Sequence, residues 1–155
     1  MDAFNTAIKI DPNFARAYAQ AANEKVFLGD PKGAIPLADT AIKLSPNDPF
    51  LGGFLWVKGR AYFTLGDYQN SIKALEDSIA ARPNLWYAQA WLVAAYKLTK
   101  QDAKAQQALA DFEQRFGSHD LDRITRYYKE EQFKNPVMQK ASAEMLQALQ
   151  QAGLK

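Results

Sequence analysis

Apolar residues recur at intervals of three and four along most of the chain, the spacing that gathers them on one face of an α-helix. Three of these amphipathic runs are followed by a Pro-Asn pair, at Pro12, Pro46 and Pro83. Proline lacks the N–H that a helix needs and disfavours helical geometry in the preceding residue, so each pair predicts a helix end. The asparagine can then cap the next helix. Because no stretch alternates apolar and polar residues as a strand does, the pattern predicts an all-α protein.

A second kind of boundary lies between the Pro-Asn pairs, at Gly29-Asp30 and at Gly66-Asp67. Glycine suits the left-handed residue that follows a helix, and aspartate suits the N-cap of the next helix. The sequence therefore predicts a repeated unit of helix, tight turn, helix and proline stop. The first two Pro-Asn pairs are 34 residues apart, and the second and third are 37 apart.

The three extra residues of the longer interval are residues 49–51. Asp48 and Pro49 fit an N-cap and a first helical position, so the next helix is expected to begin at Pro49 and to be about one turn longer. Gly52 and Gly53 then weaken its start by about 1 kcal/mol each. Two interpretations stay open: the close approach of another backbone or a ligand, or a loosely formed first turn.

A helix–turn–helix unit with a period of 34 residues resembles the tetratricopeptide repeat. The resemblance covers about residues 1–117 and rests on small, aromatic and proline residues at the family's signature positions. In the first full unit these are Tyr18, Ala22, Gly29, Asp30, Ala34, Ala41 and Pro46; in the second, Leu55, Gly59, Tyr62, Gly66, Asp67, Leu75 and Pro83; in the third, Leu92, Tyr96, Ala105 and Leu109.

The resemblance implies a right-handed superhelix, an αα-solenoid, closed by a C-terminal capping helix pair. The expected division is residues 1–14 as the second helix of an incomplete repeat, 15–48 as one repeat, 49–85 as a repeat with a lengthened first helix, 86–119 as a degenerate repeat, and 120–155 as the capping helices.

The capping region carries its own helix signals. Asn135 and Pro136 fit an N-cap and a first helical position, and Gly153 fits a C-terminal stop. A stripe at helical spacing predicts the buried face of this last helix, formed by Val137, Ala141, Met145 and Leu149.

The stretch SPNDP and the closing LQALQQAGL are similar to the tetratricopeptide tails of bacterial class III adenylate cyclases and winged-helix transcriptional regulators. This resemblance implies a part of a larger bacterial signalling or regulatory protein. Residues 3–10 match only the second helix of a repeat, which also favours a segment of a longer chain, because a repeat cannot bury its apolar face alone.

Composition narrows the function classes. The 155 residues are 48% hydrophobic, enough for a core, and the net charge of +2 gives no strong field for nucleic acid. The longest apolar run is too short to span a bilayer, and the chain does not open on a signal peptide. We therefore expect a cytoplasmic protein without membrane insertion, with the periplasm as the open alternative. The absence of cysteine excludes disulfides and thiolate metal sites.

Candidate chemistry is sparse. His119 is the only histidine, so a histidine-based metal cluster is impossible, and a capping or solvent-exposed role is expected for it. Asp120, Asp122, Glu130 and Glu131 have the pattern of solvated surface or capping carboxylates. No glycine-rich phosphate loop follows a strand. The sequence predicts a protein that is not an enzyme and holds no metal or cofactor.

In the tetratricopeptide family the first helices of the repeats line a concave groove that holds a peptide or partner domain. The resemblance therefore implies an interaction module, and the carried-over groove positions are Arg16, Gln20, Asn23, Phe27, Trp56, Arg60, Phe63, Tyr87, Trp91 and Lys97. Aromatic residues and arginine are usual interface anchors, and the basic side chains favour a ligand with carboxylates.

Three points about this groove stay open. Trp56 and Trp91 suit either the groove or an extended core. The carboxylate clamp of chaperone adaptors in this family uses Lys and Asn, and only Asn23 matches it. The alternative function is self-assembly, in which the N-terminal helix or the groove takes up a second copy.

Overall fold

The computed structural model describes residues 2–129 and 133–155. Glu130 and Glu131, expected to be surface carboxylates, lie outside the described residues. The described part of the chain forms nine α-helices and no β-strand, which confirms the all-α expectation. The helices are α1 (Asp2–Ile10), α2 (Ala15–Phe27), α3 (Pro31–Leu44), α4 (Leu51–Thr64), α5 (Tyr68–Ala81), α6 (Trp86–Leu98), α7 (Asp102–Phe116), α8 (Leu121–Tyr128) and α9 (Pro136–Ala152).

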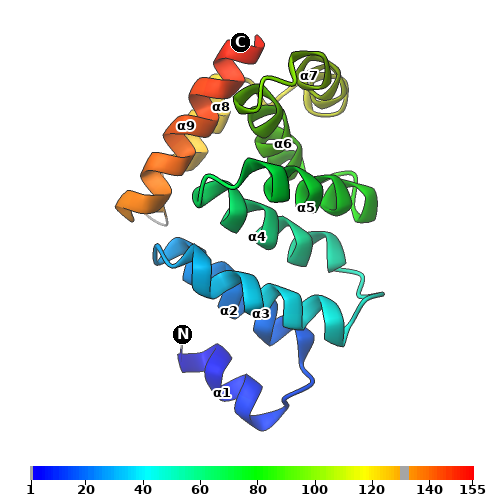
Figure 1. Cartoon of the computed structure of the whole chain (residues 1–155), viewed down its shortest axis with the longest axis vertical. Helices are drawn as coiled ribbons and strands as arrows, with labels where there is room; N and C mark the ends of the chain where they lie inside the picture. The colour runs from blue at the N-terminus through cyan, green and yellow to red at the C-terminus, as the bar shows by residue number, and fades with distance from the viewer. Residues whose placement is uncertain (1, 130–132) are drawn as a thin grey trace.

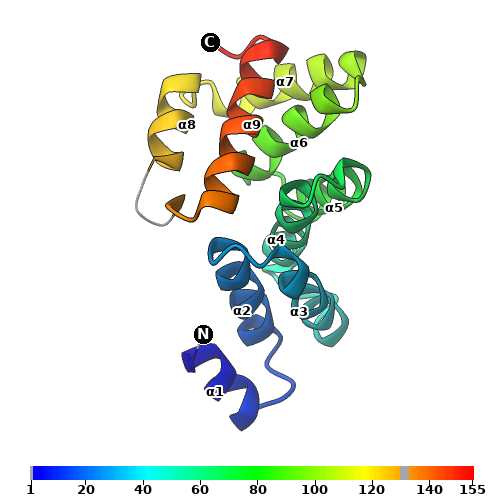
Figure 2. The ribbon, with the colours of Figure 1, turned by 60° about the vertical axis from the view of Figure 1, so that its left-hand side comes forward.

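The helices stack in chain order as hairpin pairs. Each of the pairs α2–α3, α4–α5 and α6–α7 packs tightly within itself, and each pair packs on the next. Figures 1 and 2 show the stack running from α1 at one end to α7 at the other, with α9 lying back alongside α6. The beginning of α9 thereby reaches the turn between α2 and α3 (Figure 2).

The tight turns within the pairs form as the sequence predicts. Gly29 and Gly66 adopt φ angles of 82° and 78°, the left-handed region that glycine enters without strain. Asp30 and Asp67 are the N-cap residues of α3 and α5, and each side chain accepts a hydrogen bond from a backbone N–H three residues on. Lys100 occupies the corresponding turn of the third pair with φ 59°, although it has a side chain.

The Pro-Asn pairs end helices, but their asparagines do not cap the next ones. Helices α1, α3 and α5 each end two residues before the proline. The N-cap positions of α2, α4 and α6 are instead held by Phe14, Phe50 and Leu85, with no side-chain cap bond. The prediction of asparagine caps is therefore wrong. Each asparagine lies before the N-cap residue, so its side chain is not at the capping position.

The insertion before α4 forms a turn. Helix α4 begins at Leu51 and has 14 residues, against 13 in α2 and in α6. The prediction of a start at Pro49, with an additional helical turn, is wrong. Asp48 explains the difference, because its Oδ1 accepts a hydrogen bond of 2.8 Å from the backbone N of Phe50 and so closes a turn over Pro49.

Close backbone approach explains one of the two glycines that follow. The hydroxyl of Ser78 donates a 2.7 Å hydrogen bond to the carbonyl of Gly52, and Ser71 donates in the same way, at 2.9 Å, to Gly59 one heptad later. A Cβ added to Gly52 would lie 2.5 Å from Cβ of Arg82. Of the two interpretations of these glycines, the close approach of another backbone holds at Gly52.

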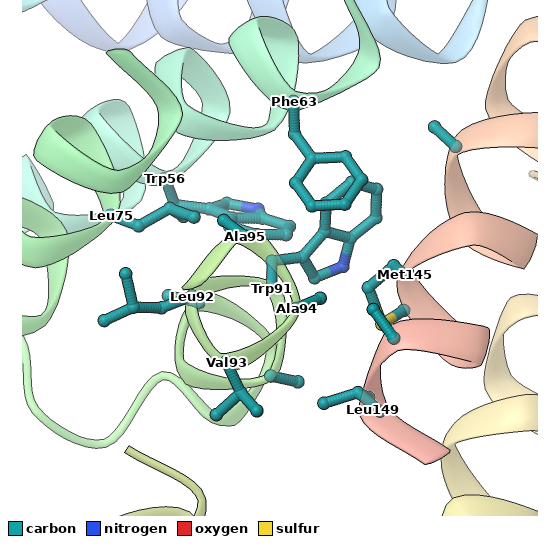
Figure 3. Close-up of a cluster of buried hydrophobic side chains, with 14 of the residues drawn as sticks. Trp56, Phe63, Leu75, Trp91, Leu92, Val93, Ala94, Ala95, Met145 and Leu149 are labelled. Carbon is teal, nitrogen blue, oxygen red and sulfur yellow. The ribbon is translucent and has the colours of Figure 1, made fainter. Parts of the chain in front are cut away.

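The core runs through α4, α6 and α9. Trp91 of α6 is completely buried, and Figure 3 shows its ring between Phe63 of α4 and Met145 of α9. Leu149 lies further along the same face of α9. The expected stripe on α9 is correct except at its first position, because Val137 is 40% exposed.

Candidate functional site

A groove of about 380 Å³ lies across the first turns of α2, α4 and α6. We call it the open groove. Its walls come from these three helices and from the turns before α4 and α6, with a lining formed by Arg16, Ala19, Gln20, Asn23, Phe50, Gly53, Phe54, Trp56, Val57, Arg82 and Tyr87. Half of the ten site residues predicted from the sequence contribute to it.

Two arginines flank an exposed aromatic ring at the edge of the open groove. The guanidinium carbons of Arg16 and Arg82 lie 4.2 Å and 5.7 Å from the ring centre of Phe50. Arg16 also forms a 3.5 Å ion pair with Asp48, which lies outside the lining. The described lining residues include these two cations and no carboxylate, so the groove offers positive charge to a ligand.

A third arginine, Arg60, which is one of the predicted site residues, is buried next to this groove. Its side chain is only 3% exposed, and its guanidinium lies 4.4 Å from the ring centre of Phe27 and 5.2 Å from that of Trp56. One amino group, Nη2, donates a 2.5 Å hydrogen bond to Oδ1 of Asn23. Burial lowers the pKa of Arg60 to about 10, so the side chain remains charged at neutral pH.

The ends of α2 and α4 and the middle of α6 are covered by α8, Phe133 and α9. We call this region the covered part. Trp91 donates a 2.6 Å hydrogen bond from Nε1 to the hydroxyl of Tyr128, and the ring of Phe27 packs edge-on against Phe133 at 5.4 Å. Phe63 packs edge-on against the ring of Trp91 and is only 1% exposed. C-terminal side chains therefore occupy the space that a groove ligand would need here.

This coverage corrects part of the sequence-based groove. Phe63 and Trp91 are core residues, and Phe27 lies outside the groove lining. Trp56 belongs to both regions, because it lines the open groove yet is only 8% exposed. Lys97 lies at the end of α6, where it forms a 2.6 Å ion pair with Asp102. The resemblance to the repeat family marks inward positions on each helix, but it does not show that the C-terminal region covers Phe27, Phe63 and Trp91.

Sequence reasoning missed the contributions of the turns. Phe50 and Arg82 line the open groove from the segments before α4 and α6, where the helical repeat pattern assigns no role. The insertion at residues 49–51 was the available signal, because it places Phe50 in the wall. Gly53 also lines the groove, and a Cβ added there would meet no atom within 4 Å, which shows how open this wall is.

Other classes of site have no support in the described residues. No three of the His, Asp and Glu side chains in these residues are grouped so as to hold a metal ion. His119 is half-buried against the ring of Trp86, at 5.0 Å between centroids. None of the described helices combines the length and the apolar character needed to cross a membrane.

The comparisons with known proteins agree with this architecture. A tetratricopeptide repeat family model matches residues 19–85. The crystal structure of MamA superposes with a TM-score of 0.69 at 17% identity, covering 97% of this chain and 85% of that one. The structure of YrrB, described as a TPR protein with an unusual peptide-binding site, gives a TM-score of 0.65 at 18% identity, covering 97% and 74%. No curated protein sequence matches.

The fold is therefore a tetratricopeptide solenoid. Proteins of this fold are generally protein–protein interaction modules and are typically non-catalytic scaffolds.

Proposed function

We propose that the protein binds a peptide or a partner domain of another protein in the open groove, and that the bound segment carries carboxylates. The observation that carries this proposal is the lining itself. Among the described residues it combines Arg16 and Arg82 with the aromatic rings of Phe50, Trp56 and Tyr87, and it holds no acidic side chain. Aromatic residues and arginine dominate the energetics of protein interfaces.

The size and electrostatics of the groove support the same ligand. A volume of about 380 Å³ is in the range of sites that enclose part of a ligand. The charge of Arg60 lies behind Asn23 and adds to the field of the two rim arginines. Carboxylates on the ligand would be attracted by the two arginines of the lining and by the buried charge of Arg60, and the attraction would weaken as salt screens the exposed pair.

The test begins with selection of peptides from a random library on the immobilised protein, followed by calorimetry of the best peptide. Gly53→Leu places a side chain in the groove without a backbone clash, so we expect at least a tenfold weaker affinity, on the order of 1.4 kcal/mol. Ala80→Leu, at an exposed position of α5, is the matched control. Unchanged affinity in Gly53→Leu, with the fold intact by circular dichroism, would place the binding site elsewhere.

We propose self-assembly through α1 as a second function. Helix α1 packs on α2, and Ile10 at its end is 80% exposed. A repeat's second helix without a first helix has an apolar side that another copy can cover. Light scattering across a dilution series should show a concentration-dependent mass that Ile10→Asp lowers. A constant monomer mass in both proteins would contradict self-assembly and leave peptide binding untouched.

We further propose that the chain is the interaction segment of a larger bacterial signalling or regulatory protein in the cytoplasm. The support is the similarity of SPNDP and LQALQQAGL to the tails of cyclases and winged-helix regulators. An antibody against this segment should detect a native product well above 17.4 kDa in the soluble cytoplasmic fraction. A product of that mass alone, or one in the periplasmic fraction, would contradict the proposal.

A further inference from the structure

The pair formed by Arg60 and Asn23 has a chemical asymmetry that fixes one side chain. Guanidinium groups carry only hydrogen-bond donors. The atom of Asn23 that faces Nη2 of Arg60 at 2.5 Å must therefore be the amide oxygen, Oδ1. The opposite assignment would place two donors against each other beside a buried charge.

Arg60 is itself held in one place. The aromatic rings of Phe27 in α2 and Trp56 in α4 pack against its guanidinium, and only 3% of the residue is exposed to solvent. It forms no ion pair with the described residues, and its Nε has no hydrogen-bond partner among them. Its bond to Asn23 is consequently the hydrogen bond through which this buried cation acts on the groove.

We propose that Arg60 is a positioning residue that orients Asn23 so that its Nδ2 amino group faces the open groove and selects a ligand carboxylate. This inference rests on the proposed function. Asn23 lines the groove, and its Nδ2 has no acceptor among the described residues. Because the oxygen of this amide already accepts a hydrogen bond from Arg60, only the N–H donors of its Nδ2 group remain for the ligand. Polarisation by the charge strengthens those donors.

Gln20 provides the internal contrast. It lines the same groove on the same helix, but it is exposed and no hydrogen bond holds its amide among the described residues. Its oxygen and nitrogen can exchange places by rotation, so it can serve a donor or an acceptor equally. The groove therefore has one adaptable amide and one amide fixed as a donor.

The first readout needs no ligand. The side-chain amide resonances of Asn23 and Gln20 are assigned in the complete protein, and Arg60→Lys is compared with wild type. Lysine keeps the charge but loses the planar fork, so we expect the Asn23 amide signals to move and the Gln20 signals to stay. Unmoved Asn23 signals in a folded variant would overturn the positioning role.

The second readout uses two pools of random seven-residue peptides that each contain one fixed glutamate, or glutamine in its place. Wild type should capture the glutamate pool in about tenfold excess, the size of effect expected for a charge-assisted hydrogen bond. In Asn23→Asp the new carboxylate pairs with Arg60 and repels the ligand, so the melting temperature should rise while the glutamate preference disappears. A structural role alone would not separate binding from stability in this way.

The outcomes distinguish the inference from the function beneath it. If wild type prefers glutamate and Asn23→Asp keeps that preference, the role of Asn23 as the donor to the ligand carboxylate is wrong, while peptide binding stands. If wild type captures neither pool, the proposed function fails, and the amide resonances still decide whether Arg60 positions Asn23. Arg60→Lys that keeps the full glutamate preference would also overturn the inference.

Discussion

The same three helices carry an open groove along their first turns and a closed core further along, at the ends of α2 and α4 and in the middle of α6. At the beginning of α2, α4 and α6 the lining combines two arginines and two amides with aromatic and aliphatic side chains, and turn residues such as Phe50 contribute to it. Further along these helices, Phe27, Phe63 and Trp91 are covered by Phe133, Tyr128 and α9. The repeat thus produces equivalent positions, and the C-terminal helices decide which of them are available to a partner.

The open groove and the covered part differ in where their polar side chains find hydrogen-bond partners. Trp91 contributes its Nε1–H to a buried tyrosine, so its polar atom has a partner inside the protein. Arg16 pairs with Asp48 and Arg82 is partly exposed, so both guanidinium groups can also be reached by solvent or a ligand. Arg60 lies at the boundary, buried like the core and charged like the groove.

The strongest test compares Trp91→Ala with Tyr87→Ala on the same helix. Trp91→Ala should lower the free energy of unfolding by about 3–5 kcal/mol, because it leaves a large cavity against Phe63 and removes the donor to Tyr128. Tyr87 is half-buried in the groove wall, so its loss should cost about 1–2 kcal/mol and weaken peptide binding. Urea unfolding followed by circular dichroism gives both values. Equal costs at the two positions would remove the distinction between the open groove and the covered part.

The adjacent glycines of α4 provide a smaller and sharper contrast. Gly52→Ala should destabilise the protein by about 1–3 kcal/mol, since its Cβ would lie 2.5 Å from Cβ of Arg82 and 3.0 Å from the carbonyl of Ser78. Gly53→Ala should stabilise it by up to about 1 kcal/mol through helix propensity, because its Cβ faces open space. Thermal unfolding of the two variants measures the difference. A stabilising Gly52→Ala would contradict the close packing of α4 on α5.

The link between the start of α9 and the first repeat should be worth less. Asn135 caps α9 by accepting from the backbone N of Val137, and its Nδ2 donates a 3.0 Å hydrogen bond to the carbonyl of Leu28. Asn135→Ala removes both and should cost about 1 kcal/mol. Asn135→Ser keeps a capping oxygen and loses only the bond to Leu28. If Ser is as costly as Ala in chemical denaturation, the bridge rather than the cap dominates; if Ser matches wild type, the bridge contributes nothing measurable.

The sequence predicts the fold because its strongest signals are local. Gly29, Gly66 and the Pro-Asn pairs act through backbone geometry within a few residues, and the helices end where those signals stand. The prediction failed at Pro49 because a side-chain bond from Asp48 to the next turn competes with helix initiation. Helix starts are decided by such competition more than by the propensity of one residue.

The candidate site was less predictable than the fold, because it depends on contacts between residues that are far apart in the sequence. The resemblance to the tetratricopeptide repeat places Trp56, Phe63, Tyr87 and Trp91 on the inward face of α4 and α6. Whether each one meets solvent depends on α8 and α9, whose contacts with α6 join residues far apart in sequence. The relation of Arg60 to Asn23 spans 37 residues and has no periodic signature.

The smallest expected effect concerns the stability of the covered part at alkaline pH. Burial raises the pKa of Tyr128 well above its usual value, because the phenolate would lose its hydration. A raised folded-state pKa gives stability that is present below the unfolded value near 10 and is lost as the pH rises above it. For this one buried group, the difference in pKa between the folded and unfolded states predicts that the free energy of unfolding falls by about 0.8 kcal/mol by about pH 10.5.

Other groups titrate in the same range, so the measurement is a difference between two proteins. Burial also raises the pKa of Tyr68 and Tyr96, while the lowered pKa of Arg60 acts with the opposite sign, adding stability above about pH 10. Tyr128→Phe removes only the contribution of Tyr128. The free energy of unfolding should therefore decrease less between pH 8 and about pH 10.5 in the variant than in wild type. Equal losses in the two proteins would mean that the Tyr128 hydroxyl reaches solvent, and that the C-terminal helices close this part of the face less completely than the buried Trp91–Tyr128 pair requires.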